Sequence, residues 1–153
     1  MWPYWLTIIL PIILSLLHDK ISFQSSKILK HLYLIYLIIF IGLRFQVGGD
    51  WFQYEDIFRL TIERNIIFDV KNDVIFTLLV RLIAIIGQDI VVLNLILALI
   101  FVYSINYFID KETDWFLVYV TIIPIYIIII GMGFIRQASA IAFFLLSTKL
   151  MFN

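Results

Sequence analysis

Residues 42–54 read GLRFQVGGDWFQY, and the organisation of the chain is clearest when it is followed outward from this stretch. Residues 32–43, which lead into it, are almost all apolar, which is typical of a membrane helix. The stretch itself carries an arginine, paired glycines, an aspartate and several aromatic side chains. We therefore interpret it as the point where a membrane helix ends and a polar, aromatic loop begins.

The composition is that of an integral membrane protein. The chain is 63% hydrophobic and 14% charged, whereas soluble domains are about 45–50% apolar and about 25% charged. Its 11 basic and 11 acidic residues cancel, which gives no overall attraction to nucleic acid. The absence of cysteine excludes disulfides and thiolate metal sites. No other cluster of metal ligands is evident, so we expect neither a metal nor a cofactor.

Apolar runs predict about five membrane-spanning helices in a single domain over residues 1–153, and hence an all-α, polytopic membrane bundle. Pro11 lies inside the first run and predicts a kink, and Pro124 interrupts the fourth. Gly131 and Gly133 then separate the fourth run from the fifth. The five runs are residues 4–17, 28–43, 90–109, 115–130 and 134–150.

The charged segments predict how the bundle is oriented. Residues 18–31 form a polar linker with three lysines and one acidic residue, which the positive-inside rule places in the cytoplasm. Residues 44–73 contain four basic and six acidic residues and are expected to form an external loop. Within that loop, apolar side chains at helical spacing predict an amphipathic helix along the membrane surface; they are Tyr54, Ile57, Phe58, Thr61 and Ile62.

Residues 74–87 decide which charged groups share one side of the membrane. A helix of this length reaches about 21 Å, short of a hydrocarbon core of about 30 Å, and Arg81 lies at its middle. We therefore expect a short re-entrant or interfacial helix. With that topology Arg44, Asp50 and Arg136 lie on the external side; if residues 74–87 crossed the membrane, Arg136 would lie on the opposite side.

Arg44 and Asp50 are candidate site residues, each with a structural alternative. Arg44 can simply extend from the helix end to the head-group level, or its planar donor fork can bind a phosphate that the following glycines let approach. Asp50 can cap the amphipathic helix together with Gln53, or it can accept a proton from a sugar hydroxyl. Trp51 and Tyr54 can stack on sugar rings or anchor the loop at the membrane interface.

Arg136 follows the Gly131–Gly133 break and opens an otherwise apolar helix. An arginine in such a place needs an ion pair, water or a bound anion. Pairing with Asp50 is the structural alternative to binding a phosphate. Gln137 adds hydrogen-bonding groups beside it, and Arg81 is a candidate third cation at the same level.

Two motifs, taken in order, resemble the EpsG family of Wzy-like exopolysaccharide and O-antigen polymerases. The first is Gly-Leu-Arg-x-x-Val-Gly-Gly-Asp-Trp-x-x-Tyr at residues 42–54, and the second is Ile-Arg-Gln-Ala-x-Ala at residues 135–140. With the order of the helices, the resemblance covers essentially the whole chain. Members of this family look about twice as long, so we expect residues 1–153 to be the N-terminal half of a longer polymerase, inactive on its own.

The resemblance implies a multi-pass glycosyltransferase of the bacterial cytoplasmic membrane that joins oligosaccharide repeat units carried on undecaprenyl diphosphate. In that reading Arg44 and Arg136 hold the donor diphosphate and Asp50 positions or deprotonates the acceptor hydroxyl. Trp51, Tyr54, Gln137 and Arg81 would contact substrate. Membrane lipids and other polysaccharide-assembly proteins are the further partners implied. A lipid-linked glycan transporter or flippase component and a non-enzymatic membrane fragment remain as alternatives.

Overall fold

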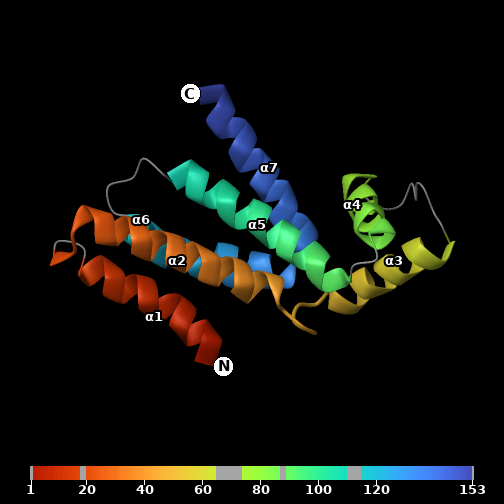
Figure 1. Ribbon diagram of the computed structural model, residues 1–153, viewed down its shortest axis with the longest axis horizontal. Coiled ribbons are helices and arrows are strands. Elements are labelled where there is room, and N and C mark those ends of the chain that lie inside the picture. Colours follow the sequence, from red (N-terminus) through yellow and green to blue (C-terminus); the bar gives the residue numbers. More distant parts are fainter. Residues whose placement is uncertain (1, 18–19, 65–73, 87–88, 110–114, 153) are drawn as a thin grey trace.

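A computed structural model describes residues 2–17, 20–64, 74–86, 89–109 and 115–152, and within these residues every regular element is a helix (Figure 1). The predicted all-α fold is confirmed. The elements are α1 (Trp2–Leu16), α2 (Phe23–Gly42), α3 (Trp51–Arg64), α4 (Val74–Ile85), α5 (Ile90–Ile109), α6 (Trp115–Ile122), the π-helix η2 (Ile123–Gly131) and α7 (Ile135–Phe152).

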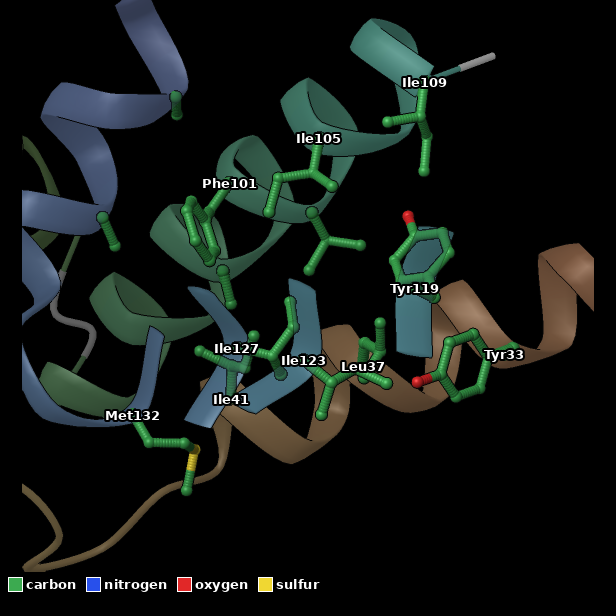
Figure 2. Close-up of a cluster of buried hydrophobic side chains, with 14 of the residues drawn as sticks. Tyr33, Leu37, Ile41, Phe101, Ile105, Ile109, Tyr119, Ile123, Ile127 and Met132 are labelled. Atoms are coloured by element: carbon green, nitrogen blue, oxygen red, sulfur yellow. The ribbon is translucent and has the colours of Figure 1, made fainter. Parts of the chain in front are cut away.

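The main core lies where α2, α5, α6 and η2 meet (Figure 2). Helix α5 packs against both α2 and α7, and α1 covers α6 and η2. Helices α2 and α5 cross so closely that a Cβ on Gly42 would lie 2.9 Å from the Cα of Leu95. The largest side chains buried in this core include Tyr33, Leu37, Phe101, Phe116, Tyr119, Ile123 and Ile127.

A second, smaller core joins α3 and α4 to the start of α5. It contains Tyr54 and Phe58 of α3, Phe76 and Val80 of α4, and Leu97 of α5. The apolar stripe predicted for residues 54–62 therefore faces α4 and α5. Its last member departs from the prediction, because the side chain of Ile62 is 52% exposed.

Among the described residues, two helices, α2 and α5, are long and apolar enough to cross a membrane. Helix α1 and the continuous α6–η2 segment are apolar but shorter. The expected count of about five spanning helices is therefore not confirmed. Helix α4 has 12 residues and reaches about 18 Å at 1.5 Å per residue, in agreement with the short helix predicted there.

The polar linker predicted for residues 18–31 is much shorter in the structure, because α2 already begins at Phe23. Ser22 caps this end, with its hydroxyl oxygen accepting a hydrogen bond from the backbone N–H of Ser25 at 3.2 Å. Ser26 and Lys30 are buried, and the Lys30 ammonium lies 5.4 Å from the centre of the Trp115 ring. The prediction followed apolar residues alone, whereas this first part of α2 is polar but contains no residue that stops a helix.

Helix α1 continues through Pro11 because α2 supplies the missing hydrogen-bond donor. In a regular helix the carbonyl of Thr7 would accept from the N–H of residue 11, but proline has no N–H. The hydroxyl of Tyr33 on α2 donates to that carbonyl at 3.0 Å. The hydroxyl of Tyr36, the next turn along, donates to the carbonyl of Pro3 at 2.9 Å. We call this contact the α1 joint.

The helical run that starts at Trp115 changes type beside Pro124, where the sequence predicts an interruption: α6 ends at Ile122 and the π-helix η2 begins at Ile123. Pro124 lies in the first turn of the nine-residue η2, so the helical segment continues past the proline with a change of helix type. The chain leaves the helical conformation at Phe134, just past the predicted glycine break, and α7 then runs alongside α5 (Figure 1). π-Helices are rare and frequently occur at functional sites, and η2 ends where the candidate residues gather.

Candidate functional site

The connection between α2 and α3 folds against the junction between η2 and α7, at one end of the bundle. Gly48 makes this possible, because its φ of +98° is a conformation that side chains disfavour. A Cβ at this position would lie 2.8 Å from the carbonyl oxygen of Met132 and 2.7 Å from that of Gly133. The first motif, residues 42–54, thus rests directly on the backbone that leads into the second motif.

Arg44 points inward, toward the end of the π-helix. Its Nη1 donates to the carbonyl of Gly131 at 3.4 Å and to the carbonyl of Met132. Its side chain is only 4% exposed, and the guanidinium carbon lies 5.9 Å from the centre of the Trp51 ring. Its Nε is buried with no hydrogen-bond partner in the described part of the chain. Arg44 therefore does not extend to the head-group level; it caps carbonyls that a helix end leaves without donors.

Burial lowers the pKa of the Arg44 guanidinium, while the nearby Tyr54 and Asp50 act in the opposite direction. An arginine starts from so high a pKa that it stays charged. A buried positive charge is therefore held against the negative end of the η2 helix dipole, which is a favourable arrangement.

Tyr54 links the two motifs through its hydroxyl. The hydroxyl donates to Oδ2 of Asp50 at 3.3 Å and accepts a hydrogen bond from the backbone N–H of Arg136. Burial and the charge of Asp50 raise the pKa of Tyr54, and the hydrogen bond and charge of Arg136 partly oppose this. The phenol is thus protonated at neutral pH and able to donate to the carboxylate.

The contacts of Arg44 and Tyr54 replace one regular helical hydrogen bond at the start of α7. In a regular helix the N–H of Arg136 would donate to the carbonyl of Met132. Here the Met132 carbonyl accepts from Arg44, and the Arg136 N–H donates to Tyr54. The Met132 carbonyl and the Arg136 N–H, which would bond to each other in a regular helix, therefore both bond to side chains of residues 42–54.

Asp50 stands immediately before α3, and its backbone carbonyl accepts from the N–H of Tyr54 at 3.0 Å. Its carboxylate is half-buried and accepts from the Tyr54 hydroxyl. In the described residues no backbone N–H of the first turn donates to this carboxylate, and Gln53 is exposed. The expected reciprocal cap between Asp50 and Gln53 is therefore not formed, which leaves the carboxylate tied to Tyr54 instead.

The Arg136 side chain lies between two aromatic rings and beside a cavity. Its guanidinium carbon is 5.3 Å from the centre of the Tyr54 ring and 5.2 Å from that of Phe76. The cavity has a volume of about 130 Å³ and presents one cation and one hydroxyl among apolar side chains. It is lined by Phe76, Leu79, Leu97, Arg136, Ser139, Ala140 and Phe143.

The remaining predicted site residues are placed differently. Trp51 is buried, 2% exposed, with its ring centre 5.8 Å from that of Phe45. Gln137 is exposed, and neither it nor the half-exposed Arg81 lines the cavity. The structure thus groups Arg44, Asp50, Trp51, Tyr54 and Arg136 and leaves Gln137 and Arg81 outside that group.

Sequence reasoning missed the residues that form the cavity around Arg136. Ser139, Ala140 and Phe143 follow it at the i+3, i+4 and i+7 positions, so their shared face was readable from the sequence. Phe76 carried no comparable signal, because its place depends on how α4 packs. In the described residues no three His, Cys, Asp or Glu side chains are grouped to hold a metal ion.

Comparison with known proteins identifies the family of this chain. The EpsG family matches residues 27–153, which includes every residue of the site. No curated protein matches the chain, and no solved structure does.

Proposed function

Because the chain belongs to the EpsG family, we propose that it acts in polysaccharide polymerisation at a membrane. In this proposal it joins oligosaccharide repeat units carried on undecaprenyl diphosphate at the outer face of the bacterial cytoplasmic membrane, as a multi-pass protein. Its partners are the lipid-linked glycan, the surrounding lipids and other membrane proteins of polysaccharide assembly.

The reaction needs a carboxylate for the acceptor and a cation for the leaving group. An acceptor sugar hydroxyl attacks the anomeric carbon of the donor, and its proton passes to the carboxylate of Asp50. The bond between that carbon and the diphosphate oxygen breaks, and the lipid diphosphate leaves with the bonding electrons. Arg136 stabilises the negative charge that grows on the departing diphosphate. No oxidant, reductant or further reactant is required.

The chain of contacts from Arg136 through Tyr54 to Asp50 is the observation that carries this proposal. The Tyr54 hydroxyl accepts from the Arg136 backbone and donates to the Asp50 carboxylate. The cation also lines a cavity whose other walls are mainly apolar, which suits an anion attached to a hydrocarbon chain. Cation, carboxylate and cavity therefore occur together at one end of the bundle.

The proposal is tested by replacing Asp50 or Arg136 with alanine in cells that make the polymer. We expect polymer yield to fall by about a hundredfold or more in each case, the size found when a group that stabilises developing charge is removed. Lipid-linked single repeat units should accumulate on the outer face of the membrane. Polymer length is read by gel electrophoresis, and an epitope tag measures how much protein reaches the membrane.

Asp56 and Arg59 provide matched controls on α3. They form a pair with an N–O distance of 3.1 Å whose side chains are 62% and 66% exposed, so alanine at either position should leave polymer yield unchanged. Normal polymer from Asp50→Ala or Arg136→Ala at normal protein level would contradict the proposal. Accumulation of repeat units on the inner face would instead identify a transporter.

A further inference from the structure

We infer that the two arginines of the site have different tasks: Arg44 and Tyr54 are positioning residues that hold the η2–α7 junction, and Arg136 alone meets the anionic substrate. For Arg136 this rests on the proposed function. For Arg44 and Tyr54 it rests on contacts that do not depend on the reaction.

The surroundings of Arg44 are those of an internal clamp. Its guanidinium donates to the carbonyls of Gly131 and Met132 and lies near the Trp51 ring, with 4% of the side chain exposed. A phosphate that reached this group would have to displace these carbonyls, and a buried carbonyl without a donor is strongly unfavourable. The two carbonyls and an anion therefore compete for Arg44, and in the structure Arg44 binds the carbonyls.

Arg136 differs from Arg44 in what surrounds it. Its guanidinium lines the cavity between α4 and α7, beside the hydroxyl-bearing Ser139. Its ring neighbours, Tyr54 and Phe76, are uncharged at neutral pH and contact the cation through the ring faces. The cavity therefore gives an anion direct access to this positive charge.

Tyr54 belongs with Arg44 in this division. Its ring is 5% exposed, whereas a ring that stacks on a sugar needs an open face. Its hydroxyl is engaged at both ends, by the Arg136 N–H and the Asp50 carboxylate. Tyr54 thus fixes the backbone from which the Arg136 side chain projects, and it orients the carboxylate at the same time.

Matched glutamine substitutions combined with a covalent tether test this division. The chain contains no cysteine, and Gly49 and Gly133 both have open space where a Cβ would be added. Because Gly48 touches the backbone of Gly133, cysteines at positions 49 and 133 lie within reach of a short bifunctional thiol reagent. The parent for the experiment is therefore Gly49→Cys with Gly133→Cys, into which Arg44→Gln or Arg136→Gln is introduced.

Arg44→Gln should lower polymer yield about tenfold to a hundredfold, the scale of a misplaced reacting group. The thiol tether should then restore at least half of the parent yield, because it holds the junction without any charge. Arg136→Gln should lose about a hundredfold and should not be restored. Arg44→Lys, which keeps the positive charge, serves as a second variant if Arg44→Gln does not accumulate, and the tether should restore it too.

The rate of tether formation gives a readout that needs no polymerisation. Arg44→Gln and Tyr54→Phe should slow it severalfold, since the loop is then less firmly held, whereas Arg136→Gln should leave it unchanged. A fully tethered Arg44→Gln protein that stays inactive, or tether formation as fast as in the parent, would overturn the inference. Failure of the proposed function alone would leave the tethering rates as expected.

Discussion

In the described part of the chain, side chains from α2 or from the loop after it take the place of regular helical hydrogen bonds at the α1 joint and at the η2–α7 junction. At the α1 joint, Pro11 removes a donor and the Tyr33 hydroxyl replaces it. At the η2–α7 junction, Arg44 supplies donors to the carbonyls of Gly131 and Met132. The donor at the α1 joint is a neutral phenol, whereas the donor at the η2–α7 junction is a cation.

The difference distinguishes an irregularity that is satisfied within the packing of α1 on α2 from one that lies at the candidate site. A neutral hydroxyl satisfies the Thr7 carbonyl without placing a charge in the bundle. The junction instead holds a buried guanidinium, and a buried charge is tolerated only when it is paired and hydrogen-bonded. The junction carries this cost where Asp50, Tyr54 and Arg136 meet, which is consistent with a functional role for it.

The largest effect is expected when the junction is forced apart at Gly48. In Gly48→Ala the new Cβ would lie within 2.8 Å of two carbonyl oxygens at a φ of +98°, so the free energy of unfolding should fall by about 2 kcal/mol or more. The measurement is thermal unfolding of the purified protein in detergent, followed by intrinsic fluorescence.

Gly49→Ala is the matched control, because no atom lies within 4 Å of the added Cβ. It should change stability by less than about 0.5 kcal/mol. Equal effects from the two alanines would mean that the loop does not rest on the junction as described.

A smaller effect is expected at the α1 joint. Tyr33→Phe removes the donor to the Thr7 carbonyl and should destabilise the protein by about 1 kcal/mol. Pro11→Ala restores an N–H at position 11, so Tyr33→Phe should cost clearly less in that background. Urea unfolding of the two single variants, the double variant and the parent gives the coupling between the sites; a coupling of zero would show that the hydroxyl does not replace the missing N–H.

The smallest expected effect is a change in how the stability of the protein depends on pH, and it concerns Tyr54 at the η2–α7 junction. The pKa of Tyr54 is raised in the folded protein, so its contribution to stability is complete below about pH 10, the usual phenol pKa. That contribution is lost as pH rises above this value through the raised pKa, because the unfolded chain then releases the proton first. Between pH 9.5 and about pH 11, the Tm should therefore fall less for Tyr54→Phe than for the parent; parallel curves would argue against a protonated, engaged phenol.

The sequence was sufficient to predict that the two motifs meet. Residues 74–87 are too short to cross a membrane as a helix, and this argument alone predicts that Arg44 and Arg136 lie on the same side. The structure brings their segments into contact. The apolar runs also predict where most of the helices lie, because membrane helices are long and have a distinct composition.

The roles within the site were not readable, since they depend on side-chain direction. Arg44 precedes a pair of glycines and Arg136 follows another, yet only the folded chain shows that Arg44 faces helix carbonyls and Arg136 faces a cavity. The start of α2 was misplaced for a related reason: Lys30 and Ser26 are polar but become buried through neighbours distant in sequence. The local sequence pattern predicts which residues are helical more easily than it predicts which face of a helix is buried.

Arg44 contacts Met132 and Tyr54 contacts Arg136. These two contacts constrain the length of the segment that joins Arg44 to Tyr54. The ten-residue separation of Arg44 and Tyr54 (54 minus 44) must match one turn of backbone in another part of the chain. Surface loops usually tolerate inserted or deleted residues, but here a change of length would lose one contact or the other. The distance between the motif's arginine and tyrosine is therefore as informative about this fold as the identity of the residues.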